Sequence, residues 1–204
     1  TNKADRELIK VAYEDYANVA EEISNGGKYN DFAMANRQIE KGRRIFKKVY
    51  NNNTLVKHSV FVYDGFKQIT EFDALNNNSL KASYLWQPVG LDVVLLRNSE
   101  YLIADGNKNI IQGRNATGNV TDAYVYDPFG KVTHNGSSEN PFRFSSEFFD
   151  SEMELVYYNY RYYMPILGRW INRDPISEDG GINLYCICCN NIIISCDENG
   201  LVLL

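Results

Sequence analysis

The chain has 204 residues, with 21 Lys and Arg against 26 Asp and Glu, which gives a formal net charge of −5. This length can bury a core without disulfides or metal ions, and the acidic balance argues against a nucleic-acid partner because no surplus of cations exists to neutralise phosphates. No apolar run approaches the roughly 18 residues of a membrane-spanning helix, so we predict no membrane span.

Residues 1–42 form the first predicted segment. Apolar residues recur between Asp5 and Ile23 at positions 8, 9, 12, 16, 19, 20 and 23, which is a helical spacing with a charged opposite face. Asn25-Gly26-Gly27 would end such a helix, so we predict a short N-terminal helix. A degenerate strand unit, of the kind that follows in the chain, is the alternative interpretation. Because the chain begins with Thr1, we expect it to be a piece of a longer polypeptide whose export signal lies outside it.

A short motif recurs about every 20 residues through residues 43–139 and once beyond them. Its copies are Tyr63-Asp64-Gly65, Tyr84-Leu85-Trp86, Ala104-Asp105-Gly106, Tyr126-Asp127-Pro128 and Phe149-Asp150. The aromatic residues favour a strand, while Asp can bond its own backbone in a turn and Gly supplies a positive φ. Each copy therefore predicts a strand that ends at the motif and turns back.

Three further polar clusters between these motifs predict tight hairpin turns. They are Asn51-Asn52-Asn53, Asn76-Asn77-Asn78 and Thr117-Gly118-Asn119. With 15 Tyr, ten Phe and 14 Gly in the chain, this pattern predicts a mainly β fold, with about eight short antiparallel strands over residues 43–135.

Residues 140–201 carry a series of sequence blocks in a fixed order. The blocks are NPFRFSSEFFD, YYNYRYY, LGRWINRDPI, GGINLY, NN and D-x-x-G-L, the last running from Asp197 to Leu201. In this order they resemble the RHS repeat-associated core domain, and the recurring aromatic-Asp motif resembles the YD repeat of the same proteins.

The resemblance implies a curved antiparallel YD-repeat sheet, part of a hollow spiral shell, which the core domain over residues 140–201 closes. It also implies a bacterial protein that is secreted or delivered to a cell surface. The expected partners are further repeats upstream and a C-terminal effector domain held inside the shell. Residues 202–204 would be the remnant that follows a cleavage point.

Self-cleavage by an aspartyl protease is a further implication of the resemblance, with Asp174 and Asp197 as catalytic carboxylates and the bond between Leu201 and Val202 as the cut. Two carboxylates held close together cannot both ionise cheaply, so one is charged and activates water while the other is protonated and polarises the carbonyl. Arg173 would hold one carboxylate through a bidentate contact.

A structural interpretation stays open beside this one. Arg173 and Asp174 could form an ion pair that caps a turn, with Pro175 fixing the direction of the chain. Glu198 and Ile192 stand where the family has Pro. The alternative function is accordingly a non-catalytic structural or adhesive cell-surface YD-repeat protein.

Four cysteines lie within a short stretch near the C-terminus: Cys186, Cys188, Cys189 and Cys196. Their spacing lacks the two C-x-x-C-like pairs of a structural zinc site, so we predict small buried apolar residues, no metal and no cofactor. A disulfide stays possible in an exported protein. His58 and His134 lie in polar surroundings and outside any catalytic motif, and we expect both at the surface.

Overall fold

The computed structural model describes residues 9–12, 43–90, 92–192, 195, 197–198, 200 and 202–203. The chain divides into two compact units, Thr1–Ala82 and Ser83–Leu204. Nearly all regular structure within the described ranges is antiparallel strand, joined by turns and four short 3-10 helices. The predicted mainly β fold is confirmed. No helix in this part of the chain is long and apolar enough to cross a membrane.

The first unit is built on an antiparallel meander in which each strand pairs with the next. Its strands are β1 (Ile9–Ala12), β2 (Phe46–Asn51), β3 (Thr54–Asp64), β4 (Lys67–Asp73) and the beginning of β5 (Ser79–Trp86). Asn52 and Asn53 join β2 to β3 with φ values of 47° and 63°, the positive values that match a two-residue hairpin to the twist of its strands. The buried side chains of Phe46 and Val60 form the core on this sheet.

The predicted N-terminal helix is wrong where the structure describes it. Ile9–Ala12 form strand β1, which pairs antiparallel with residues 48–51 of β2. A strand edge leaves backbone N–H and C=O groups without partners, and pairing satisfies them. This pairing overrides the local helical periodicity and agrees with the alternative interpretation, a degenerate strand unit. The remainder of the predicted helix lies outside the described residues.

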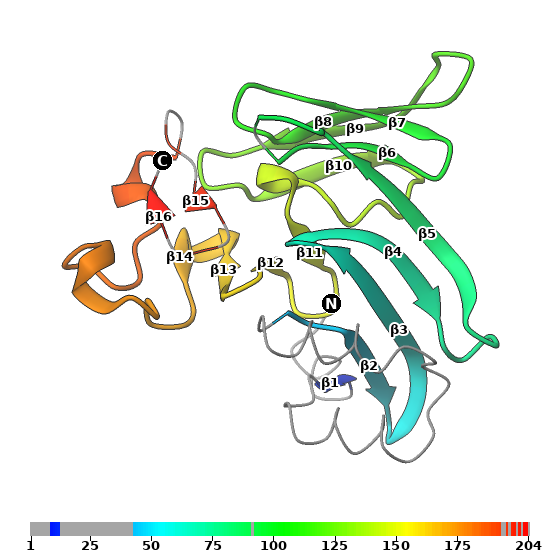
Figure 1. The fold of residues 1–204 in the computed structure, drawn as a ribbon, viewed down its shortest axis with the longest axis horizontal. Helices are drawn as coiled ribbons and strands as arrows, with labels where there is room; N and C mark the ends of the chain where they lie inside the picture. Colours follow the sequence, from blue (N-terminus) through cyan, green and yellow to red (C-terminus); the bar gives the residue numbers. More distant parts are fainter. Residues whose placement is uncertain are drawn as a thin grey trace. The chain divides into compact units, whose positions relative to one another are not determined.

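The remaining repeat strands belong to the second unit, where each again pairs antiparallel with the next (Figure 1). After the end of β5 come β6 (Val94–Arg97), β7 (Glu100–Ala104), β8 (Ile110–Arg114), β9 (Val120–Tyr126) and β10 (Val132–Gly136). Side chains alternate between the faces, as a strand requires. Leu102 and Tyr124 are buried on one face, whereas Tyr101 and Val125 are exposed on the other.

At the end of its strand, the Asp of the repeat motif accepts hydrogen bonds from backbone N–H groups of the following turn, as the sequence predicts. Asp105 Oδ1 accepts N–H bonds from Asn107 at 2.8 Å and Asn109 at 3.0 Å. Asp127 Oδ1 accepts the equivalent bonds from Phe129 and Lys131, both at 2.9 Å. One carboxylate thus replaces the ladder partners that the backbone loses at the turn.

The C-terminal blocks form a second, smaller sheet in the same unit. Its strands are β11 (Phe148–Asp150), β12 (Leu155–Tyr158), β13 (Arg161–Met164) and β14 (Arg169–Trp170), and a separate pair follows, β15 (Asp197–Glu198) with β16 (Val202–Leu203). The 3-10 helices are η1 (Phe144–Ser146), η2 (Pro165–Leu167), η3 (Ser177–Gly180) and η4 (Cys188–Asn190). Tyr158, Tyr163 and Trp170 are almost fully buried at the centre of its core.

Hydrogen bonds join this smaller sheet to the repeat strands of its own unit. The Tyr163 hydroxyl donates to the carbonyl of Phe129 at 2.8 Å, and the backbone N–H of Ile110 donates to the carbonyl of Arg143 at 2.9 Å. The repeat strands β6–β10 and the C-terminal blocks therefore share one compact unit, and the boundary between the two units falls inside the predicted repeat region.

A buried carboxylate stabilises the last repeat hairpin. Asp122 on β9 lies 2.6 Å from Nε2 of His134 and accepts the N–H of Ser138 at 2.9 Å. The His134 ring stacks on Tyr124 with centroids 4.6 Å apart, and its side chain is 20% exposed, so this predicted surface histidine is partly buried. Burial acts to raise the pKa of Asp122, but the hydrogen bonds from His134 and Ser138 outweigh it and hold that pKa below its ordinary value of 3.8.

We predict that Asp122→Asn lowers the free energy of unfolding at pH 7 by about 1–3 kcal/mol. A carboxyl whose pKa is lower in the folded state stabilises the fold above its unfolded-state pKa, and that stabilisation is lost as the pH falls through the folded-state value. The variant should therefore lose less stability than the native chain between pH 5 and pH 2, as measured by urea unfolding. The exposed residue Glu139 provides the control, as Glu139→Gln. Equal acid sensitivity of native chain and Asp122→Asn would contradict the prediction.

Candidate functional site

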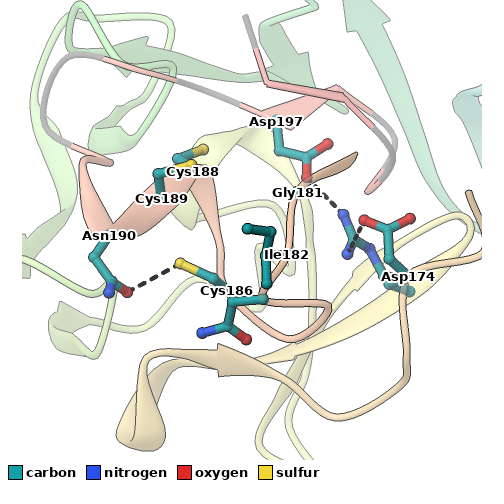
Figure 2. A pocket seen from close by; sticks show the side chains of 10 residues that line it. Asp174, Gly181, Ile182, Cys186, Cys188, Cys189, Asn190 and Asp197 are labelled. Atoms are coloured by element: carbon teal, nitrogen blue, oxygen red, sulfur yellow. Dashed lines mark hydrogen bonds and ion pairs between the residues drawn. The ribbon is translucent and has the colours of Figure 1, made fainter. Parts of the chain in front are cut away.

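A buried guanidinium joins two carboxylates in the second unit. Arg161 opens strand β13, and its side chain is 3% exposed. Its Nη1 lies 2.7 Å from Asp174 Oδ2, and its Nη2 lies 3.0 Å from Asp197 Oδ2. Figure 2 shows the two carboxylates at the same end of a pocket, with dashed lines marking these bonds. Both are charge-assisted hydrogen bonds, the strong kind in proteins.

Asp174 is fixed by the turn that the LGRWINRDPI block forms after β14. Its backbone N–H donates to the carbonyl of Leu184 at 3.1 Å, and its Oδ1 accepts the N–H of Ile176 at 3.0 Å. Pro175 stands between Asp174 and Ile176 and restricts the backbone there. One carboxylate oxygen thus orders the turn, which leaves the other for Arg161.

Asp197 is fixed by strand pairing near the end of the chain. It lies on β15 opposite Leu203 of β16, and its side chain is 5% exposed. Gly200 follows with φ +78°, and a Cβ at this position would lie 3.0 Å from the carbonyl oxygen of Tyr158. The Gly200 carbonyl in turn accepts a hydrogen bond from Arg161 Nε. Arg161 therefore contacts the C-terminal segment at two points.

Aromatic side chains pack against the ion cluster of Arg161, Asp174 and Asp197. The guanidinium carbon of Arg161 lies 4.1 Å from the centroid of the Trp170 ring, which is cation–π distance. Tyr158 packs edge-on against Trp170, with centroids 5.0 Å apart. Burial raises the pKa of Tyr158 well above its ordinary value, and burial likewise raises the pKa of Tyr163, so both phenols stay neutral at physiological pH.

The structure brings together two of the predicted site residues. Asp174 and Asp197, 23 positions apart in the chain, meet at one guanidinium. Arg173 is exposed, and the guanidinium between the carboxylates is that of Arg161 instead. Leu201 lies outside the described residues, and Val202 begins strand β16.

Sequence reasoning missed Arg161, although the YYNYRYY block carries a usable signal. Tyr158, Arg161 and Tyr163 are all buried in strands of one sheet. A charged residue at a core position of an aromatic strand needs a buried partner of opposite charge. The acidic residues of the later sequence blocks, Asp174 and Asp197, are candidates for that partner.

The pocket beside the cluster has a volume of about 240 Å³. It is lined by Arg161, Asp174, Gly181, Ile182, Asn183, Cys186, Cys188, Cys189, Asn190 and Asp197. A water molecule occupies about 30 Å³ in the liquid, so several could reach the carboxylates. Figure 2 shows the pocket with the three cysteines on its wall.

The described cysteines differ in their exposure to solvent. Cys188 is buried, as predicted, whereas Cys189 is exposed and Cys186 is intermediate. Cys186 Sγ lies 3.3 Å from Asn190 Oδ1, and burial raises the pKa of the Cys186 thiol. The prediction of buried apolar residues is therefore wrong for Cys189, and Cys196 lies outside the described residues. No group of three or more potential metal-binding side chains occurs in the described part of the chain.

Comparison with known proteins places the chain in a family. The Teneurin YD-shell family model matches residues 40–185, and the chain belongs to this family. The toxin protein Tse5 of Pseudomonas aeruginosa is 38% identical over 63 residues, which cover 31% of this chain and 5% of Tse5. The toxin subunit YenC1 of Yersinia entomophaga is 32% identical over 91 residues, which cover 42% of this chain and 9% of YenC1.

Longer but weaker matches agree with this assignment. The tRNA nuclease WapA of Bacillus subtilis is 27% identical over 186 residues, which cover 87% of this chain and 8% of WapA. The crystal structure of TcdB2-TccC3-Cdc42 matches with a TM-score of 0.59 and 22% identity over 78% of this chain and 8% of the matched chain, a likeness of fold. The chain thus spans less than a tenth of the length of each of these proteins, and the resemblance to RHS and YD-repeat proteins is confirmed.

The close approach at Gly200 yields a prediction about the C-terminal segment. Gly200→Ala should shift the segment after β15 away from Tyr158 by a few tenths of an ångström, because the added Cβ meets a backbone oxygen and the residue must also keep a left-handed conformation. We expect faster amide hydrogen exchange at Asp197 and Glu198, together with a loss of about 1–3 kcal/mol of stability.

Gly118→Ala is the matched control, because Gly118 has φ +85° and a Cβ added there would meet nothing within 4 Å. It should cost about 1 kcal/mol through backbone strain alone and leave exchange in β15 at the native rate. Native exchange at Asp197 in Gly200→Ala would show that the contact with Tyr158 does not hold the segment.

Proposed function

We propose that this chain is the closing segment of a bacterial RHS-type toxin shell, which encloses a C-terminal effector and releases it by cutting the chain between Leu201 and Val202. The observation that carries the proposal is the ion cluster of Arg161, Asp174 and Asp197, which is buried and lies next to the segment that contains the predicted cut. Secretion or delivery to a cell surface follows from such a role.

The shell part of the proposal is supported by the family and by the names of its relatives. Tse5 is described as a toxin protein and YenC1 as a toxin subunit. An antiparallel meander can be extended strand by strand at its edges. Additional repeats upstream are the expected continuation of this sheet, and the effector is the expected content of the shell.

Hydrolysis at this site needs one water, one base and one acid. In the proposed reaction one ionised carboxylate of the Asp174 and Asp197 pair takes a proton from water as the water oxygen bonds to the carbonyl carbon of Leu201. The other, protonated carboxyl then gives its proton to the leaving nitrogen of Val202. The products are a new carboxyl group on Leu201 and a new amine on Val202, and the single positive charge of Arg161 balances the one carboxylate that stays ionised.

Presentation of the substrate is intramolecular. Leu201 follows Asp197 by four positions in the sequence, and β15 pairs with β16 on the far side of the predicted cut. Holding a reacting bond beside its catalytic groups replaces a bimolecular encounter and supplies a large part of the rate enhancement in comparable reactions.

The proposal is tested on the chain of residues 1–204 extended by an inert C-terminal reporter. We expect intact-mass analysis of the native sequence to show a released product that begins at Val202. Asp174→Asn and Asp197→Asn should each slow release by about a hundredfold or more, because each removes the acid–base function of one carboxyl. The exposed Asp179 supplies the matched control, and Asp179→Asn should release the reporter at the native rate.

An uncut native chain with an intact fold, shown by its circular dichroism and its tryptophan emission, would refute self-cleavage. The second candidate, a non-catalytic structural or adhesive cell-surface protein, would then be favoured. The observation in its favour is the sequence near the cut, where Glu198 and Ile192 replace the Pro residues of the resembling family.

A further inference from the structure

We propose that Cys186 and Cys189 are a redox-active dithiol, which closes to a disulfide by exchange with a low-molecular-weight disulfide such as glutathione disulfide. The pair has C-x-x-C spacing, with Ile187 and Cys188 between the two thiols. Both cysteines line the pocket beside the ion cluster, so the bridge would be a covalent modification of the pocket wall. Neither thiol acts in the proposed cleavage, and the dithiol is independent of that activity.

The backbone between the two cysteines has the geometry of a tight turn. Ile187 has φ −88° and ψ 128°, and Cys188 has φ 46°. A type II turn combines such an extended first central residue with a positive φ at the second, and it holds the Cα atoms of its first and fourth residues within about 7 Å. Disulfides span Cα separations of about 4.4–6.8 Å, so this backbone allows Cys186 and Cys189 to bridge.

Hydrogen bonds fix the chain in this folded-back conformation. The Cys186 thiol donates to Asn190 Oδ1, with Sγ 3.3 Å from the oxygen (Figure 2). The backbone N–H of Asn190 donates to the carbonyl of Ile187, and that of Asn191 donates to the carbonyl of Cys188, both at 2.8 Å. The turn is therefore ordered while the thiols are reduced, and closing the bridge requires little further loss of backbone freedom.

The three described cysteines of this turn differ in a way that assigns the pair. Cys189 is exposed, Cys186 is intermediate and Cys188 is buried. Cys188 belongs to the core around Tyr163 and Trp170, where a reagent in solution does not reach it. Burial raises the pKa of the Cys186 thiol, and the neighbouring Cys189 adds to this effect. Cys189 is therefore the thiol that meets a reagent first, and Cys186 is its resolving partner.

Bridge formation is a two-electron oxidation of the protein in two exchange steps. The Cys189 thiolate attacks one sulfur of the small disulfide, forms a mixed disulfide and releases a small thiolate. Cys186 then loses its proton to solvent, its sulfur bonds to that of Cys189, and the second small thiolate leaves. Each small thiolate takes up a proton, so one small disulfide is reduced to two thiols. Export, which the proposed function includes, would bring the dithiol into a compartment that favours the bridge.

The test exposes the folded chain of residues 1–204 to glutathione disulfide and stops the exchange with acid. The remaining free thiols are then labelled, and the labels are located by fragmentation in a mass spectrometer. We expect label on Cys188 and none on Cys186 or Cys189, with a mass that shows the loss of two hydrogens from this pair. Dithiothreitol should restore both thiols, and the circular dichroism should stay native throughout.

This measurement uses the native sequence and does not depend on the folding of any variant. Free Cys186 and Cys189 thiols in the treated, folded chain would overturn the inference. A bridge from either of them to Cys188 or Cys196 would overturn it as well. Neither result bears on self-cleavage, which is measured by reporter release.

Single substitutions separate the roles of the two thiols. Cys186→Ser should stop at the mixed disulfide and carry glutathione on Cys189, because the resolving thiol is missing. In Cys189→Ser, the partly buried Cys186 should react with glutathione disulfide about tenfold more slowly than Cys189 does in Cys186→Ser. Cys188→Ala is the matched control and should bridge at the native rate. Equal reaction rates of Cys186 and Cys189 in the two serine variants, or loss of the bridge in a folded Cys188→Ala, would overturn the assignment.

Discussion

The C-terminal half of the second unit depends on the burial of one positive charge. Arg161 stands in a strand of tyrosines, and an isolated guanidinium in such a place would cost several kcal/mol in lost solvation. Asp174 and Asp197 compensate that cost only if the turn after β14 and the strand β15 both reach the same point. The ion cluster therefore connects three blocks that are separated in the sequence.

The aromatic residues of the repeats and of the core blocks make this burial possible. Tyr158, Tyr163 and Trp170 of the smaller sheet form its buried core together with Ile187 and Cys188. The hydrogen bond from Tyr163 to Phe129 joins this sheet to the turn between β9 and β10. The repeat turn at Asp127 positions Phe129 through its own N–H bond. This turn is thus linked to the ion cluster through contacts of Phe129 with Tyr163, of Tyr163 with Trp170, and of Trp170 with Arg161.

The sequence predicted the features that depend on neighbours along the chain. The hairpins at Asn52 and Gly118 and the strand ends at Asp105 and Asp127 follow from side-chain and backbone preferences over a few residues. Local patterns are insufficient where pairing with a distant strand determines the secondary structure. Ile9–Ala12, for example, pair with β2 despite the helical spacing of their apolar residues. The contacts of His134 with Asp122 and Tyr124 are likewise not apparent from adjacent residues, because these partners lie on the preceding strand.

The same distinction explains the site. The blocks led to Asp174 and Asp197, but adjacency suggested Arg173 as their partner, whereas a turn at Pro175 directs Asp174 inward and leaves Arg173 exposed. The partner of a buried charge such as Asp174 is determined by the tertiary fold, and its neighbour in the sequence need not be that partner.

A stabilising role alone is a weak explanation for such a cluster. Buried ion pairs and triads often contribute no more stability than apolar side chains of the same volume, since desolvation offsets most of the Coulomb attraction. The surrounding residues, Trp170, Tyr158 and Ile187, show that this core accommodates large apolar groups. Two carboxylates on one guanidinium, open to a pocket that admits water, are the arrangement that the proposed self-cleavage requires, and stability alone gives little reason for them.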